Sequence, residues 1–344
     1  MPSPTHGSGT SHELPRYPAA RRHGSGNGGV NAGLDSEVGD LREPGVGDLT
    51  PAAVPEGGEG YRTGSVFRMM LAVFMENHLA VLGLGLIAFM VLFSFLGPFI
   101  YHTQQVFNNP NIVNLAPSLS HPLGTDNIGY DNLGRLMLGG QTSLEVGLAA
   151  ALVAVTIGAT WGAAAGLAGG FVDAIMMRIV DAMLAIPFLF LIIVLGTIFI
   201  PSVPELIIVI GLVAWLVPAR LVRGETLTLR VRDYVQAVRV MGGGSGRILF
   251  RHIIPNSIGT IVVNATFQVA DAILTVAALS FLGLGIAAPA TNWGSQLSDG
   301  TTYIYDGYWW LIYPAGIAIV VTVVAFNFVG DALRDALEVR LQQR

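Results

Sequence analysis

Few residues in this chain of 344 could carry out catalysis or bind a metal ion. Cysteine is absent, which excludes disulfides, thiolate metal sites and cysteine nucleophiles. All 18 basic residues are arginine, and a phosphate-binding loop of the Walker type requires lysine. The seven histidines have no metalloprotease spacing, and the residues around Ser245 do not form a serine-hydrolase elbow. We therefore expect no enzymatic activity, no metal site and no cofactor in this chain.

One carboxylate stands in an apolar stretch that is long enough to cross a membrane. Asp271 lies between Pro255 and Leu279, together with Asn264 and Gln268. A charged group in lipid is costly unless it faces water or a partner. The three polar residues are therefore candidates to line a translocation path, and a hydrogen-bonded packing site is the open alternative.

A polar segment between two apolar stretches, residues 223–256, is the most informative part of the chain. Apolar side chains recur in it at helical spacing and predict a short helix with one apolar face, formed by Tyr234, Ala237, Val238 and Met241. The glycines that begin at Gly242 predict the end of this helix, and Pro255 suits the first turn of the next one. Such a helix lies on a membrane surface or is offered to a soluble partner.

The composition predicts that membrane spans position these residues. Hydrophobic residues make up 52% of the chain, charged residues only 12%, and the mean hydropathy is +0.59. A soluble domain is roughly one-quarter charged. Because about 20 apolar residues cross the hydrocarbon core, we predict an all-α, polytopic membrane protein with six spans. They lie at 79–100, within the charge-free stretch 146–172, at 179–200 and 205–222, from after Pro255 to 279, and at 308–329.

The distribution of arginine predicts the orientation of these spans. If the N-terminus is cytoplasmic, the external segments are 101–142, 201–204 and 280–307, and Arg135 is the only arginine that they contain. The other 17 arginines then lie on the cytoplasmic side. Because cytoplasmic loops of membrane proteins are rich in arginine and lysine, we predict that both termini are cytoplasmic.

Composition changes sharply before the first span. Residues 1–60 contain 13 glycines and seven prolines, with eight acidic residues and four arginines, and they lack apolar periodicity. This composition predicts a disordered tail. We expect an amphipathic helix at 61–78 and a membrane domain at 79–340.

Four glycines in the second predicted span are four residues apart, which would place them on one helix face: Gly158, Gly162, Gly166 and Gly170. A strip of this kind lets a second helix backbone approach closely, and packing drives helix association in lipid. We expect the strip to serve helix packing, and a substrate groove along it is the alternative.

At the polar segment the chain resembles the EAA loop of ABC-importer membrane subunits. The resemblance rests on Gln236-Ala237-Val238, then Gly242, and then His252-Ile253-Ile254-Pro255. The longer runs DYVQAVRVMG and RILFRHIIPN are most similar to the dipeptide, oligopeptide and nickel permease branch, and to its C-type subunit. Similar runs extend over nearly all of residues 70–340, namely HPLGTDNIGYDNLGRLMLGGQTSL, MMRIVDAMLAIPFL, ALSFLGLG, TNWGSQL and VAFNFVGDALRDALEVR.

The chain departs from this family pattern at several positions. Gln236 replaces the usual Glu of the loop, and Val238 replaces its second Ala. Tyr130 replaces a basic residue of the outer loop. In the fifth span Val276 stands where this branch often carries Glu, and an acid occurs earlier, at Asp271.

The resemblance implies a type I ABC importer of a bacterial plasma (inner) membrane. This chain would be its non-catalytic membrane subunit, paired with a second, related permease subunit. Two ABC ATPase subunits would bind ATP and Mg, and an extracytoplasmic substrate-binding protein would deliver the cargo. Lipid is a further expected partner and nucleic acid is not.

The resemblance also implies a mechanism, in which the ATPase subunits hold the segment 233–255 and drive alternating access. The residues expected to couple the subunits are Tyr234, Gln236, Ala237, Val238, Met241, Gly242, Arg251 and Pro255. Peptides are the expected cargo, and nickel or another metal chelate is the alternative. A secondary transporter or channel subunit is a second alternative, which predicts ionisable residues at several mid-membrane positions.

Overall fold

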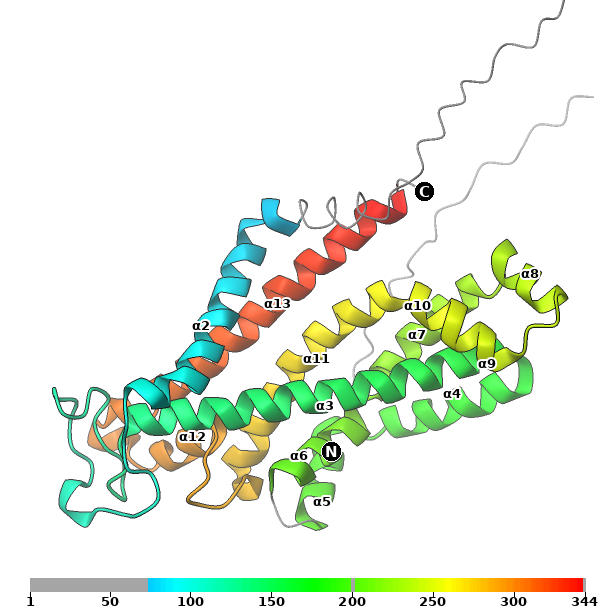
Figure 1. Cartoon of the computed structure of the whole chain (residues 1–344). Coiled ribbons are helices and arrows are strands. Elements are labelled where there is room, and N and C mark those ends of the chain that lie inside the picture. The colour runs from blue at the N-terminus through cyan, green and yellow to red at the C-terminus, as the bar shows by residue number, and fades with distance from the viewer. Residues whose placement is uncertain (1–73, 199–201, 343–344) are drawn as a thin grey trace, which may run out of the picture. The chain divides into compact units, whose positions relative to one another are not determined.

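The computed structural model describes residues 74–198 and 202–342 (Figure 1). The predicted tail at 1–60 and residues 61–73 of the predicted amphipathic helix lie outside the described residues. Within the described ranges every regular element is a helix, and no strand is present. The predicted all-α class is therefore confirmed.

Four helices are each long and apolar enough to cross a membrane. They are α2 (His78–Ile100), α3 (Asn132–Ala168), α11 (Ile258–Leu279) and α13 (Tyr313–Gln342). Two bent helix pairs raise the number of candidate spans in the described residues to six. These pairs are α4 (Gly170–Leu184) with α5 (Phe188–Ile198), and α6 (Val203–Ala214) with α7 (Leu216–Leu229).

Shorter elements connect the candidate spans. Between α7 and α11 lie α8 (Asp233–Val240), α9 (Ser245–Ile248), a π-helical turn (Leu249–Ile253) and α10 (Ile254–Asn256). A second π-helical turn (Ser280–Leu284) and α12 (Trp293–Thr301) follow α11. Single 3₁₀ turns are found at Pro110–Ile112, Ile304–Asp306 and Trp309–Leu311.

The third and fourth predicted spans are interrupted in the structure. The axes of α4 and α5 differ by 84°, and those of α6 and α7 by 43°. Proline explains both breaks: Pro187 disfavours helical geometry in the residue before it, and Pro218 has no N–H to bond to the carbonyl of Ala214. The prolines were visible in the sequence, but apolar content alone did not reveal the bends.

Helix α3 runs the length of the helical assembly and packs closely against α7 (Figure 1). Gly158, Gly162 and Gly166 lie at this contact. A Cβ atom added at Gly162 would lie 2.2 Å from the carbonyl oxygen of Ala219, so only glycine allows this approach.

The prediction that Gly170 shares the packing face is wrong. Helix α3 ends at Ala168, and Gly170 begins α4 with a φ of 53°. Nothing lies within 4 Å of the position that its Cβ would occupy. The four-residue repeat therefore ends at Gly166, because the chain reverses direction just after it.

Helix α2 is the least buried of the four long helices. It packs against α13 and α3 through small residues such as Ala80 and Gly83. Its other face exposes large apolar side chains, among them Leu82, Phe89 and Leu96. A helix of this composition suits direct contact with lipid.

Candidate functional site

The segment 223–256 contains the predicted short helix, α8, anchored by two valines. Val235 is fully buried and Val238 is half-buried. Both pack into a cluster with Ala159 and Ala163 of α3, Val222 of α7, Ile248 of α9 and Ile253 of the π-helical turn. Val238 was predicted to share a face with Tyr234, Ala237 and Met241, but the structure separates it from them: Val235 and Val238 form the inward side.

The outward side of α8 exposes apolar groups. Tyr234, Ala237 and Met241 are exposed there, and the neighbouring Val240 is 88% exposed. Sequence reasoning missed both Val235, the inward anchor, and Val240. The sequence did contain a signal for Val235, because this residue stands three positions before Val238 and therefore on the same helix face.

The glycines end α8 with a recognisable motif. Gly242 has a φ of 81°, and its N–H donates to the carbonyl of Arg239. The N–H of Gly243 donates to the carbonyl of Val238 at 2.8 Å. This pair of bonds defines a Schellman motif, which requires a left-handed residue that glycine adopts without strain.

Hydrogen bonds join α8 to the long helices. The side-chain amide of Gln236 donates to the carbonyl of Arg230 at 2.9 Å. The Arg230 guanidinium in turn donates to the carbonyl of Gly166, at the end of α3, also at 2.9 Å. A displacement of α8 would therefore be transmitted to α7 and α3 by direct contacts.

The last two predicted coupling residues lie further along the segment. Arg251 belongs to the π-helical turn and Pro255 to α10, and both are exposed. The ring of Tyr234 lies 6.4 Å from that of His252, so α8 and this turn are neighbours.

Two ion pairs connect α4 to α7. The Arg223 guanidinium donates to both carboxylate oxygens of Asp173, at 2.6 and 2.7 Å, in a bidentate arrangement. Arg220 donates to Asp181 at 2.5 Å. Sequence reasoning did not predict either partner, because the residues are 50 and 39 positions apart in the chain.

Asp271 borders a cavity of about 390 Å³ between α11 and the two helix breaks. Its side chain is exposed to this space, and most of the lining is apolar. Val276, where the resemblance implies Glu, is fully buried in a hydrophobic cluster. The acid of this chain therefore stands at the position on α11 that faces open space.

Gln268 lines the same cavity but has a structural bond as well. Its amide nitrogen donates to the carbonyl of Ala214 at 2.7 Å. This carbonyl has lost its normal helical donor, because the residue four positions later is Pro218. A side chain that replaces a lost backbone donor is what a bent helix in lipid requires.

Asn264 does not join Asp271 in this cavity. It borders a separate space of about 410 Å³ with Thr260, Phe267 and Arg334. The side-chain oxygen of Asn264 is buried without a hydrogen-bond partner. The prediction of a single path through all three polar residues is therefore not supported for Asn264.

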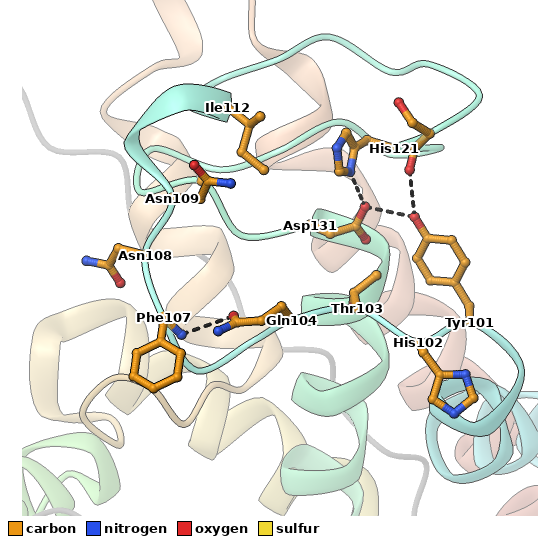
Figure 2. Close-up of a pocket in the computed structure, with 12 residues that line it drawn as sticks. Tyr101, His102, Thr103, Gln104, Phe107, Asn108, Asn109, Ile112, His121 and Asp131 are labelled. Carbon is orange, nitrogen blue, oxygen red and sulfur yellow. Dashed lines mark hydrogen bonds and ion pairs between the residues drawn. The ribbon is translucent and has the colours of Figure 1, made fainter.

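At the other end of α3, residues 101–131 surround a polar pocket of about 500 Å³ (Figure 2). Asp131 is its organising residue and is only 4% exposed. One carboxylate oxygen caps α3 by accepting the N–H of Gly134 at 2.9 Å. The other accepts the Tyr101 hydroxyl at 2.9 Å and lies 2.8 Å from Nδ1 of His121. Burial, and then the bond and the charge of Asp131, raise the pKa of Tyr101 to about 12.

Tyr130 is one of the positions at which the chain departs from the family pattern. Its ring lies 4.8 Å from the Arg135 guanidinium carbon, and its hydroxyl donates to Asn108 at 2.9 Å. Nearby, Asp126 accepts the backbone N–H groups of Ile128 and Tyr130. Burial nevertheless raises the pKa of Asp126, although these bonds and the charge of Arg135 oppose the change.

Comparison with known proteins identifies the family. Residues 154–343 match the binding-protein-dependent transport system inner membrane component, and residues 65–117 match the N-terminal TM domain of oligopeptide transport permease C. The chain belongs to this family of permeases. The predictions of a non-catalytic importer subunit and of a membrane location are thereby confirmed.

Relatives of this permease cover most of its length. It is 44% identical to the oligopeptide transport system permease protein OppC of Escherichia coli (strain K12), over 77% of this chain and 88% of the relative. It is 38% identical to OppC of Bacillus subtilis, over 81% and 91%. The dipeptide transport system permease protein DppC of Alkalihalophilus pseudofirmus is 37% identical, over 82% and 92%.

Proposed function

We propose that this permease forms half of the translocation pathway of an ATP-driven peptide importer. The observation that carries the proposal is the similarity, over more than three-quarters of the chain, to permeases named for oligopeptide and dipeptide transport. The same names favour peptides over nickel or another chelate as the cargo. The family membership argues against a secondary transporter or channel.

In this proposal α8 is the contact for an ATPase subunit. Support comes from the exposed apolar groups Val240 and Met241, which flank the helix end beside Arg239. Uncovered apolar side chains on a polar segment favour a protein partner. A membrane-surface role for α8 is the alternative.

The bonds from Gln236 to Arg230 and from Arg230 to Gly166 provide a mechanical route from α8 to the spans. ATP-driven closure of two ATPase subunits would displace α8 and, through this route, α7 and α3. To convert a population from 1:99 to 99:1, ATP must bind the favoured state about 5.5 kcal/mol more tightly. A rigid attachment of α8 is needed for that energy to reach the cavity.

The remaining assignments complete the proposed assembly. A second, related permease provides the other half of the pathway, and an extracytoplasmic binding protein delivers cargo to residues 101–142 and 280–307. Both termini and α8 lie on the cytoplasmic side, as the arginine distribution indicates. Asp271 and Gln268 line the pathway from this permease.

The coupling role is tested by two substitutions in the reconstituted importer. Gly242→Val forces a branched residue to a φ of 81°, and Ala237→Asp places a charge on the outward face of α8. We expect both variants to insert and assemble but to lose substrate-stimulated ATP hydrolysis by at least about tenfold, equivalent to about 1.4 kcal/mol of coupling.

Gly246→Val is the matched control in the same segment. Gly246 has no positive φ, and nothing lies within 4 Å of its Cβ position. We expect this variant to retain coupling. Full substrate-stimulated hydrolysis in both Gly242→Val and Ala237→Asp would exclude α8 as the coupling element, and failure of the wild type to take up trialanine would exclude peptide import.

A further inference from the structure

The cavity beside Asp271 lies where both bent helix pairs are interrupted. Leu184 ends α4 and Phe188 begins α5, while Ala214 ends α6 and Leu216 begins α7, and all four residues line the cavity. Asp271 approaches from α11, near the middle of that helix. Interrupted spans that surround a cavity are frequent substrate sites in membrane transporters.

The polar groups of this cavity are mostly acceptors. Asp271 is the only charged residue in the lining. The Gln268 amide nitrogen is occupied by the Ala214 carbonyl, and the Thr275 hydroxyl donates to the backbone carbonyl of Asp271 at 2.7 Å. What remains for a ligand is a carboxylate, an amide oxygen, the lone pairs of a hydroxyl and the second N–H of the Gln268 amide, so acceptors outnumber donors.

We infer that this cavity binds a primary ammonium group of the transported substrate, with Asp271 as its counter-ion. The inference rests on the proposed function and names the chemical group that the pathway recognises. An ammonium ion has three donors and no acceptor, which matches the acceptors that the cavity leaves free. The N-terminus of a peptide carries this group.

Charge favours the same ligand. No cation within the described residues forms an ion pair with Asp271, so its charge is uncompensated when the cavity is empty. A carboxylate at this depth is costly unless a partner or water neutralises it. A metal ion is a poorer match, because the described residues contain no group of three metal-ligating acidic or histidine side chains.

The rest of the cavity suits the part of a substrate next to its ammonium group. Phe188, Val217 and Leu274 supply apolar surface on three different helices. Such walls bind a range of apolar side chains by contact area rather than by shape. The cavity would therefore recognise the charged end of a substrate and tolerate variation beside it.

The absence of cysteine from this chain allows a direct test. Leu274 lines the cavity and is 45% exposed, so Leu274→Cys introduces a single reporter thiol. In the complete importer in nanodiscs, we would compare its rates of reaction with a cationic aminoethyl and an anionic sulfonatoethyl thiosulfonate. Labelling of this chain would be followed by mass spectrometry, with and without ATP.

We expect the cationic reagent to be favoured, and we expect Asp271→Asn to reduce this preference by about tenfold, as the loss of one nearby charge predicts. Trialanine at millimolar concentration should slow the labelling, whereas N-acetyltrialanine, which lacks the ammonium group, should not. Leu221→Cys is the matched control, because Leu221 is 44% exposed but lines a different cavity. Its labelling should not respond to Asp271→Asn.

Three results would overturn the inference. The first is the same preference for the cationic reagent in the presence of Asp271 and of Asp271→Asn, and the second is equal protection of Leu274→Cys from labelling by trialanine and N-acetyltrialanine. The third is no labelling of Leu274→Cys with or without ATP. Uptake of trialanine by the wild-type importer separates this inference from the proposed function. If uptake occurs but the charge preference is absent, only the ammonium site is wrong. If the wild type takes up no peptide, the proposed function fails and the inference fails with it.

Discussion

At its C-terminal end α3 is held by close backbone contact with α7, whereas at its N-terminal end it is held by a network of polar side chains. Gly162 at the first end meets the backbone of Ala219. Asp131 at the second end caps the helix and bonds to Tyr101 and His121. The first end also carries exposed apolar groups on α8, while at the second end both carboxylate oxygens of Asp131 have hydrogen-bond partners within the protein.

This difference between the two ends of α3 indicates how each end responds to an applied force. Helices in backbone contact shift as one body, because packed atoms leave no space to deform. Exposed apolar groups such as Val240 next to this rigid contact are suited to receive a partner and pass on its motion. The polar network around Asp131 instead holds a long connection in one conformation, which suits a stable external surface.

The largest expected effect comes from adding one methyl group to a glycine at each end of α3. In Gly162→Ala the new Cβ meets backbone, whereas in Gly134→Ala it meets the Thr103 and Gln105 side chains, whose displacement costs their hydrogen bonds but no shift of a neighbouring helix backbone. We expect Gly162→Ala to lower stability by about 3 kcal/mol or more and Gly134→Ala by about 1 kcal/mol.

The measurement is the thermal unfolding midpoint of the purified importer. Gly85→Ala on α2 is the control, since nothing lies within 4 Å of its Cβ position. Equal losses in the Gly162 and Gly134 variants would show that the two ends of α3 are not held differently.

A smaller loss of stability is expected when an ion pair between α4 and α7 is broken. In Arg223→Ala the Asp173 carboxylate, which is 11% exposed, loses both of its guanidinium bonds. Breaking a fully buried pair costs about 3–5 kcal/mol, and the partial exposure of Arg223 reduces the expected loss to about 1–3 kcal/mol.

Arg220→Ala provides the comparison for this pair. The side chains of Arg220 and Asp181 are 51% and 46% exposed, so the loss should not exceed about 1 kcal/mol. Unfolding of both variants in the same detergent would measure the difference. If Arg220→Ala lowers the stability more than Arg223→Ala does, the bidentate Asp173–Arg223 pair does not help to hold the C-terminal end of α3.

The membrane class, the spans and the loop helix could be predicted from sequence because each depends on local composition or periodicity. The spacing of Tyr234, Ala237, Val238 and Met241 predicted a helix, but which side of this helix faces inward depends on the position of α3. The Asp173–Arg223 pair and the bonds of Asp131 to Tyr101 and His121 depend on residues brought together by the fold, so no local pattern revealed them.

The residues predicted to line a translocation path show the same limit of prediction from local sequence. Asp271 and Gln268 were found because polar residues are rare in spans, yet the role of Gln268 follows from a proline on another helix. Asn264 is also polar and stands four residues before Gln268, on the same helix face, but it borders a different cavity. Spacing places residues on one face, and only the neighbouring helices decide what each part of that face meets.

The smallest expected effect is the alkaline behaviour of the polar end. The pKa of Tyr101 is raised from 10 to about 12, chiefly by burial and further by Asp131. Because the folded value is the higher one, the stabilisation is complete below pH 10 and is lost as the pH rises from 10 to 12. Asp131→Asn should lower this pKa but not restore it to 10, because burial is the larger cause.

The titration would be read as the phenolate absorbance difference between the wild type and Tyr101→Phe, which isolates one of the nine tyrosines. At pH 7 the Tyr101→Phe variant loses the contacts of its hydroxyl with Asp131 and with the carbonyl of Ser120 and leaves the α3–α7 contact untouched, so coupling should be retained. A Tyr101 that titrates near pH 10 would show that its hydroxyl is neither buried nor bonded to Asp131 as in this structure. The contrast between the two ends of α3 would then rest on the glycine contact alone.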